Sequence, residues 1–341
     1  MTPHKHLVIG LTYDLRDEYL ARGYCEEQVA EFDSESTIVA LETALSQLGH
    51  KTERIGNALA LAKRLACAQR WDLVFNICEG LDGRSREAQV PALLELYGIP
   101  YTFGDPLTCA LTLDKAMAKR VVRDAGIRTP DFAVVRELDD LDGLSLSYPL
   151  FAKPLAEGTG KGVDERSRVD DPEQLVAVCT RLLERFAQPV LIEEYLPGRE
   201  FTCALLGTGP RAGVLGTLAM TIHENAPTRD YSYAVKEQCE VYVRYDPMES
   251  GDLRDAVEAL SLAAYRLLDG RDTGRVDVRL DQNGRPCFIE LNPLPGLHPS
   301  HSDLPMIATQ QGMAYRDLIG RIVASAMERA EVGPCHASRA S

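Results

Sequence analysis

The sequence lacks several features that define other classes of protein. Its apolar runs are interrupted well short of a membrane span, so we expect no transmembrane helix. The first ten residues hold too short an apolar run for a signal peptide, which favours a cytoplasmic location. An excess of positive charge is also missing, because the formal net charge is −14. This balance argues against nucleic acid or an anionic membrane as a general partner.

Organised cysteine and histidine chemistry is missing as well. The nine cysteines are odd in number and form no CxxC pair, which fits reduced thiols better than disulfides or a zinc site. No Ser/His/Asp or Cys/His arrangement predicts a protein nucleophile. The pairs His4/His6 and His298/His301 are interpreted as a terminus and as pocket lining, not as ligands of a transition metal. With 45% hydrophobic and 26% charged residues, the chain is typical of a soluble globular protein.

What is present is a regular alternation of strand and helix patterns. A chain of 341 residues is long for one core, so two or three domains are expected. The first hundred residues alternate strand and helix, which predicts an α/β unit with a doubly wound parallel sheet. The expected strands are 7–11, 52–55, 73–77, 99–102, 132–135, 150–153 and 190–194, then a strand-rich region to 245 and a hairpin near 275–292. The expected helices are 35–48, 58–70, 87–97, 114–124, 172–186, 253–268 and 315–329.

The hairpin is the most informative segment. Strong turn residues, Asp-Gln-Asn-Gly, separate two apolar runs. Glu290 and Asn292 are two residues apart and share a face of their strand, which Asp277 can meet from the partner strand. Two carboxylates and an amide oxygen suit Mg²⁺. Arg275 lies on the same face and can stabilise developing negative charge. An ordinary acidic hairpin with a Pro/Gly exit has the same spacing.

A glycine-dense turn follows the strand that contains Lys153. Three glycines within 158–162 let backbone N–H groups approach an anion, a natural seat for phosphates. Lys153 would reach a phosphate from the strand end, and Thr159 and Lys161 can add a hydroxyl and a charge. The spacing matches neither the Walker nor the Rossmann motif, so the loop alone is a weak signal.

Two further segments are ambiguous when each is considered alone. Lys115 and Lys119 are four apart on one helical face, which can bind phosphate or simply be solvated. The segment 190–202 joins two strands through Pro197-Gly198 and predicts either a plain hairpin or an adenine-binding edge. In the second case Glu200 can reach a ribose hydroxyl.

In this order, the segments resemble the ATP-grasp ligases, and within them the D-alanine–D-alanine ligase-like family. The resemblance covers about 7–329. It implies an ATP-grasp fold of class α/β (α+β overall), with an N-terminal α/β domain at 1–106, a central lid domain at 107–194, a C-terminal mixed-sheet domain at 195–332 and a flexible tail at 333–341. It is strongest in Gly98-Ile-Pro-Tyr-Thr102, Asp114-Lys115, Lys153-Pro154, Glu157-Gly158, Gly198-Arg-Glu-Phe-Thr202, Arg275-Val-Asp277, Glu290-x-Asn292 and Pro295-Gly296.

The resemblance also implies roles for individual residues. ATP would contact Lys115, Lys153, Glu157, Gly158, Gly160, Gly162, Glu193, Glu194, Leu196 and Glu200. Two Mg²⁺ ions, or Mn²⁺ in their place, would be held by Asp277, Glu290 and Asn292. Catalytic roles would fall to Arg275, Gly296, Lys236 and Thr159, and substrate contacts to Glu35, Glu237, His301 and Ser302.

The chain departs from the family pattern where substrates bind. Thr159-Gly160 stands where two serines are usual, and Glu237 follows the loop lysine where an aromatic residue or His is usual. One extra residue separates Gly296 from His301. Asp33 and Glu35 compete as the acid that holds the first substrate's amine.

The departures leave the nucleotide machinery intact and the amino-acid pockets altered. The expected function is an ATP-dependent carboxylate–amine ligase that joins two amino-acid-like substrates through an acyl phosphate. The alternatives are an authentic D-alanine–D-alanine ligase and a non-enzymatic nucleotide-binding module. A carboxylate at Glu237 would favour a cationic acceptor, and Arg84 and Arg86 would bind an extra acid on one substrate. The resemblance also suggests a homodimer.

Overall fold

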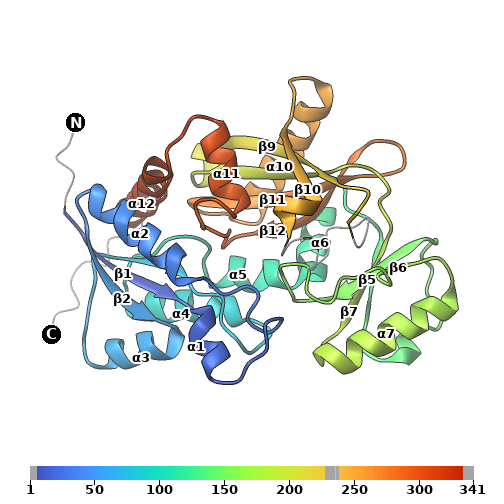
Figure 1. Cartoon of the computed structure of the whole chain (residues 1–341), viewed down its shortest axis with the longest axis horizontal. Coiled ribbons are helices and arrows are strands. Elements are labelled where there is room, and N and C mark those ends of the chain that lie inside the picture. Colours follow the sequence, from blue (N-terminus) through green and yellow to red (C-terminus); the bar gives the residue numbers. More distant parts are fainter. Residues whose placement is uncertain (1–5, 227–234, 236–237, 333–341) are drawn as a thin grey trace.

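The computed structural model describes residues 6–226, 235 and 238–332. Three β-sheets follow one another along the chain, and Figure 1 shows the C-terminal sheet between the other two. The N-terminal sheet is parallel, and the other two are antiparallel. No helix in the described part of the chain is long and apolar enough to cross a membrane.

The N-terminal sheet has the strand order β2-β1-β3, with helices on both faces. Ile9 of β1 and Phe75 of β3 pack against α2, whereas Val74 packs on the opposite face with Leu61 of α3. Because successive strand residues point to opposite faces, nearly continuous apolar runs are needed here. The elements are β1 (Val8–Tyr13), α1 (Arg16–Ala21), α2 (Glu35–Gln47), β2 (Lys51–Gly56), α3 (Ala58–Ala66), β3 (Leu73–Ile77), η1 (Arg86–Ala88) and α4 (Gln89–Leu96).

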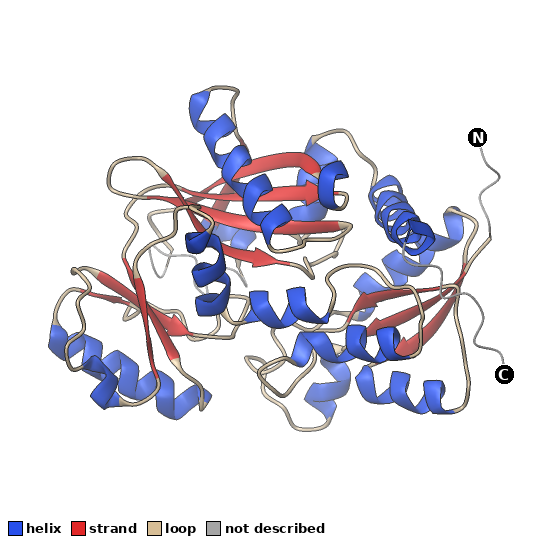
Figure 2. Ribbon diagram, turned by 180° about the vertical axis from the view of Figure 1, so that it is seen from behind, coloured by secondary structure: helices blue, strands red, loops and turns tan. Residues whose placement is uncertain are grey.

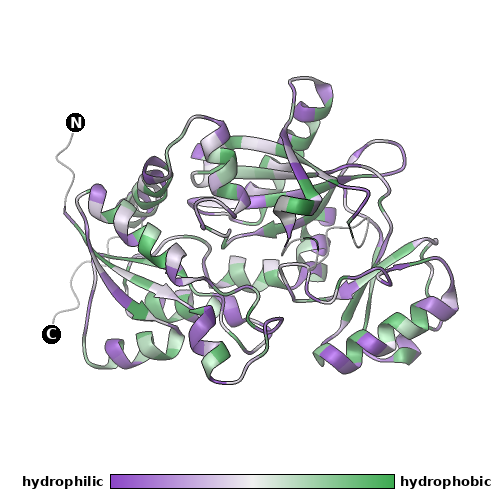
Figure 3. Ribbon diagram, in the orientation of Figure 1, coloured by the Kyte–Doolittle hydropathy of each residue, from purple (hydrophilic) through white to green (hydrophobic). Residues whose placement is uncertain are grey.

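The small central sheet has the order β4-β7-β5-β6 and is covered by one amphipathic helix, α7 (Pro172–Phe186). The Asp171 side chain accepts from the Gln174 N–H and Pro172 occupies the first turn, so this helix begins as its sequence predicts. Figure 3 shows hydrophobic and hydrophilic residues alternating around it. The other elements are α5 (Pro106–Leu113), α6 (Lys115–Asp124), β4 (Phe132–Val135), η2 (Leu138–Leu141), β5 (Leu150–Pro154), β6 (Arg168–Val169) and β7 (Val190–Glu194).

The C-terminal sheet has the order β10-β9-β8-β11-β12. Figure 2 shows the strands of the sheets in red and the helices packed beside them in blue. Helix α10 buries Val257 and Tyr265 against it, and α11 contacts β8 and β9. Its elements are β8 (Glu200–Leu206), η3 (Gly209–Arg211), β9 (Gly213–Ile222), α9 (Cys239–Tyr242), β10 (Val243–Pro247), α10 (Asp252–Leu267), β11 (Thr273–Leu280), β12 (Pro286–Asn292), α11 (Asp303–Gln310) and α12 (Tyr315–Val332).

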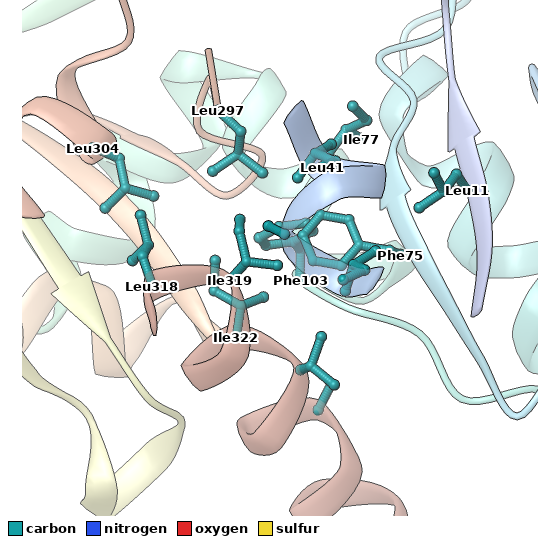
Figure 4. Close-up of a cluster of buried hydrophobic side chains, with 14 of the residues drawn as sticks. Leu11, Leu41, Phe75, Ile77, Phe103, Leu297, Leu304, Leu318, Ile319 and Ile322 are labelled. Carbon is teal, nitrogen blue, oxygen red and sulfur yellow. The ribbon is translucent and has the colours of Figure 1, made fainter. Parts of the chain in front are cut away.

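The largest core joins the two ends of the chain. Leu11, Leu41 and Phe75 from the N-terminal part pack with Leu318 and Ile322 of α12 in one buried cluster (Figure 4). The central sheet has a separate core beneath α7. The first and third sheets therefore share a hydrophobic core, which the central sheet does not join.

Most expected elements are confirmed, and the exceptions have local causes. The predicted helix 58–70 is too long, because α3 ends at Ala66 and Ala68 turns left-handed at φ 59°. The predicted strand 99–102 is reduced to a single bridge between Val74 and Tyr101. Helix α5, capped by Asp105, was not expected before α6. The sequence patterns also missed the short helices α1 and α11.

Candidate functional site

A deep cavity lies between the central and C-terminal sheets; we call it the first cavity. Its walls come from α6, β5, the glycine-dense loop, the end of β7 and strands β8, β11 and β12. Thirteen of the predicted site residues line it: Lys115, Lys153, Glu157, Gly158, Thr159, Gly160, Glu193, Glu194, Leu196, Glu200, Arg275, Asp277 and Glu290.

Two lysines hold one glutamate at the base of this cavity. Strands β5 and β7 are paired, and Lys153 Nζ lies 2.7 Å from Glu193 Oε2. Lys119 Nζ, fully buried on α6, lies 2.6 Å from Glu193 Oε1. Burial opposes ionisation of Glu193, but the two lysines outweigh it and lower its pKa to about 2. Burial also lowers the pKa of Lys119, to about 8.

Lys115 connects the glycine-dense loop to the hairpin. Its Nζ donates to the Glu157 carbonyl oxygen at 2.6 Å and lies 3.1 Å from Glu290 Oε2. Asp114 caps α6 by accepting from the Met117 N–H, which fixes Lys115 in the first turn. Burial opposes ionisation of Glu290, but Lys115 and Lys153 lower its pKa to about 2. The lysines thus meet carboxylates at the positions where the sequence predicts phosphate.

The backbone of the glycine-dense loop has positive φ angles, which residues other than glycine rarely adopt. Gly160 has a φ of 67°, and Thr159 is held at 55°, an unusual value for a residue with a branched Cβ. A Cβ on Gly162 would lie 2.6 Å from Pro154 Cγ, so this glycine permits close packing although it does not line the cavity. The Gly158 N–H donates to Glu31 Oε1 at 2.5 Å.

One part of the first cavity is lined by apolar and aromatic side chains. Phe151, Leu196 and Ile289 line it beside Tyr195, whose ring lies under the Arg279 guanidinium at 5.1 Å. Arg279 Nη1 also lies 3.6 Å from Glu200 Oε2. This apolar and aromatic slot, with the Glu200 carboxylate near it, suits a purine and a ribose. Sequence reasoning missed the aromatic and arginine residues here, because their spacing follows no motif.

The hairpin brings the three predicted metal ligands together. Asp277 is paired with Glu290 across β11 and β12, and Asn292 Nδ2 lies 3.2 Å from Asp277 Oδ2. Burial raises the pKa of Asp277, Arg275 opposes the rise and Glu290 adds to it. In the described residues no group of three His, Cys, Asp or Glu side chains is placed to hold a metal. Two carboxylates plus the Asn292 amide oxygen nonetheless fit a hard divalent cation.

Arg275 stands where the first cavity meets a second one. Its Nε and Nη2 donate to Asp277 at 3.0 Å each, and its Nη1 donates to Asp303 at 2.7 Å. The second cavity shares Gly158 and Thr159 with the first as well. The predicted residues Asn292, Gly296, His301 and Ser302 line this second cavity.

The structure separates the two acids that competed for a substrate amine. Asp33 lines the second cavity, where burial raises its pKa to about 7. Glu35 lies outside both cavities on α2, with Oε1 2.7 Å from Arg54 Nη1. Arg84 pairs with Asp114, and Arg86 pairs with Glu31, so both arginines suggested for an extra substrate acid have protein partners. The predicted residues Lys236 and Glu237 lie outside the described residues.

Three acids with no sequence signal also belong to this region. Glu31 lines the second cavity and lies 3.1 Å from both Arg86 Nη2 and Lys161 Nζ. Glu87 and Asp303 are buried and line the same cavity. Nothing in their local sequence distinguishes them from surface acids, because their positions depend on contacts distant in the chain.

Comparison with known proteins agrees with this arrangement. Residues 121–324 match the family model described as the D-ala D-ala ligase C-terminus. A D-alanine–D-alanine ligase of Bordetella petrii is 36% identical over 265 residues, covering 76% of this chain and 77% of the relative. An uncharacterized protein of Sinorhizobium fredii is 34% identical and covers 84% of this chain and 86% of its own length.

Solved structures show the same fold. A D-alanine–D-alanine ligase from Bacillus anthracis complexed with ATP has a TM-score of 0.74 at 23% identity, covering 95% of this chain and 99% of its own. A D-Ala:D-Ser ligase from Enterococcus faecalis has a TM-score of 0.73 at 19% identity, covering 94% of this chain and 100% of its own. The ATP-grasp fold expected from the sequence is confirmed. The chain belongs to the D-alanine–D-alanine ligase-like family of ATP-grasp enzymes, which are ligases that form C–N bonds.

Proposed function

We propose that this protein joins the carboxylate of one amino-acid-like substrate to the amine of another, with ATP as the energy source and an acyl phosphate as the intermediate. One observation carries the proposal. A cavity with lysines, a glycine-dense loop and a paired-carboxylate hairpin opens at Arg275 onto a second, polar cavity. Such a junction suits transfer of a phosphoryl group from a nucleotide to a neighbouring carboxylate.

The first cavity would hold ATP. Its purine would occupy the slot beside Phe151 and Leu196, with Glu200 near the ribose. Phosphate oxygens would replace the carboxylates that now contact Lys115 and Lys153 and would accept from the loop N–H groups. Asp277, Glu290 and Asn292 would hold Mg²⁺, which supplies charge that neutralises phosphate oxygens.

Two balanced steps follow. A carboxylate oxygen of the first substrate attacks the γ-phosphorus, the bond to the β-phosphate oxygen breaks, and ADP leaves. The uncharged amine of the second substrate then attacks the acyl carbon, phosphate leaves, and the nitrogen loses a proton. Arg275 lies beside Gly158 and Thr159 at the junction, where it would stabilise the oxyanion of the tetrahedral intermediate.

A second candidate is the ligation of two D-alanines. It is favoured by the relatives named D-alanine–D-alanine ligase, which cover about three quarters of the chain at 32–36% identity. The lining of the second cavity favours other substrates. It contains Glu31, Asp33, Glu79, Glu87 and Asp303, whereas two small monoamino acids bring only one ammonium group each.

The deciding experiment measures phosphate release with ATP and Mg²⁺ across D- and L-amino acids, dipeptides and diamines, with mass spectrometry of the products. A new amide mass from a pair other than D-alanine supports the general ligase. Turnover of D-alanine alone supports the second candidate. Tight ATP binding with no amide from any pair contradicts the proposal. A chelator added to an active mixture should stop phosphate release, and Mg²⁺ or Mn²⁺ should restore it.

A further inference from the structure

One wall of the second cavity is unusually acidic. Three carboxylates on it come from the N-terminal domain: Asp33 just before α2, Glu79 just after β3, and Glu87 in η1. They arise from separate segments, so the fold and not a local run of acids brings them together. Glu87 is 8% exposed, and its side chain still lines the cavity.

The other acids of this cavity have cationic partners. Glu31 is held by Arg86 and Lys161, and Asp303 by Arg275. By contrast, Asp33, Glu79 and Glu87 form no ion pair with any residue that the structure describes. Of the described residues that line the cavity, the arginines are Arg16 and Arg275, and each contacts a different acid, Glu26 or the Asp277–Asp303 pair.

The charged forms of these buried acids are unfavourable unless positive charge is supplied nearby. Burial raises the pKa of Glu87 to about 7, with further contributions from Glu31 and Glu290 against Arg86 and Lys115. Burial raises the pKa of Glu79 well above its usual value, and the neighbouring Glu87 and Glu31 add to this. Burial also raises the pKa of Asp33 to about 7, a hydrogen bond with Thr37 opposes the rise, and Asp14 adds to it. An ammonium group placed among them would favour their charged forms, because opposite charges close together stabilise ionisation.

We propose that the substrate bound against this wall is a diamino acid, an amino acid with a second cationic group on its side chain. One ammonium group balances the charge of only one of the three carboxylates, whereas two ammonium groups balance two of them. This inference rests on the proposed ligase function and names the substrate class of its second cavity. A monoamino acid of the same length would leave more of the wall protonated and would gain fewer charge-assisted contacts.

Matched substrate pairs test this directly. Diaminopropionate, diaminobutyrate, ornithine and lysine, as D and L forms, are compared with alanine, aminobutyrate, norvaline and norleucine of equal chain length. One diamino acid should have a KM at least about tenfold below its monoamino match, the size expected for a charge-assisted contact. Equal or lower KM values for all monoamino acids overturn the inference and leave the ligase function standing.

Two variants locate the effect in the wall. In Glu79→Gln and Glu87→Gln, the KM of the preferred diamino acid should rise about tenfold while the KM of ATP stays constant. The matched control is Glu184→Gln, whose side chain is exposed on α7 away from both cavities. Wild-type preference in both wall variants contradicts the inference, provided that their thermal unfolding shows them to be folded.

Binding without turnover separates this inference from the ligase proposal. Calorimetry with a non-hydrolysable ATP analogue, in buffers of different ionisation enthalpy, counts the protons released as a diamino acid binds. A smaller release of protons in Glu87→Gln supports the diamino-acid inference even if no amide is ever formed. No release, or equal release with monoamino acids, overturns it even if the enzyme is an active ligase.

Discussion

Glu193 and Glu290 in the first cavity differ from Glu79 and Glu87 in the second in the positive charge that lies beside them. In the first cavity, Glu193 and Glu290 contact lysines, which lower the pKa of each to about 2. In the second, Glu79 and Glu87 form no ion pair with a described residue, and burial raises the pKa of each although Arg86 opposes the rise. Burial disfavours the charged form in both places, so the difference comes from the placement of lysines.

The difference indicates which ligand charge each cavity favours. In the first cavity, lysines already neutralise Glu193 and Glu290, so a ligand must replace these ion pairs. A nucleotide with bound metal does so, because it brings both phosphate oxygens and cations. The second has unmatched acids and gains most from a cationic ligand. The charge balance among the protein's own residues thus distinguishes two classes of substrate.

The largest expected effect is at the ion pairs of the first cavity. Lys153→Met should lower kcat/KM by about 10³-fold, because it removes a phosphate contact and leaves Glu193 with Lys119 alone. Steady-state phosphate release measures this. Lys63→Met, at an exposed position on α3, is the matched control. Near-normal activity in Lys153→Met would show that the ion pair is only structural.

The junction of the cavities should be the next most sensitive place. Arg275→Lys keeps the charge but loses the fork that contacts Asp277 and Asp303, so kcat should fall about 100-fold with little change in the KM of ATP. Single-turnover kinetics would place the loss in the chemical step. A change confined to the KM of ATP would instead assign Arg275 to nucleotide binding.

A smaller effect is expected where the N-terminal part of the chain contacts the glycine-dense loop. Glu31→Gln weakens the ion pairs with Arg86 and Lys161, and kcat/KM for ATP should fall about tenfold. Limited proteolysis should cut the loop faster. Glu27→Gln is the control, because its partner Arg185 is half exposed and such surface pairs contribute little. Equal effects of the two changes would contradict a specific role for Glu31.

The smallest effect is on stability, and its sign is fixed by the raised pKa of Glu87. Between its usual pKa near 4.5 and its folded value of about 7, the native state binds more protons than the unfolded state. Stability therefore falls as pH rises through this range, and Glu87→Gln removes that loss. The Tm of the variant minus the Tm of wild type should increase by about 3 °C from pH 5 to pH 8. Thermal unfolding without ligand tests this, and Glu184→Gln should show no such trend.

Sequence alone could predict the parts of the site that are local in the chain. The hairpin with Asp277, Glu290 and Asn292 was predictable because strand alternation and one turn fix its geometry. The glycine-dense loop was also predictable, because its three glycines lie within five residues of the sequence. Glu31, Glu79 and Glu87 were not, since their roles depend on contacts between separate segments. The choice between Asp33 and Glu35 likewise required the fold, because both acids have similar neighbours in sequence.

The shared core of the first and third sheets has a consequence for synthesis of the chain. Strand β1 and helix α2 are made first, yet the face that they bury is completed by Leu318 and Ile322 of α12. That apolar surface stays open until almost the whole chain has been made. The earliest segment to leave the ribosome must therefore wait for the last one, and a chain that stops before α12 is left with an exposed hydrophobic face at its start.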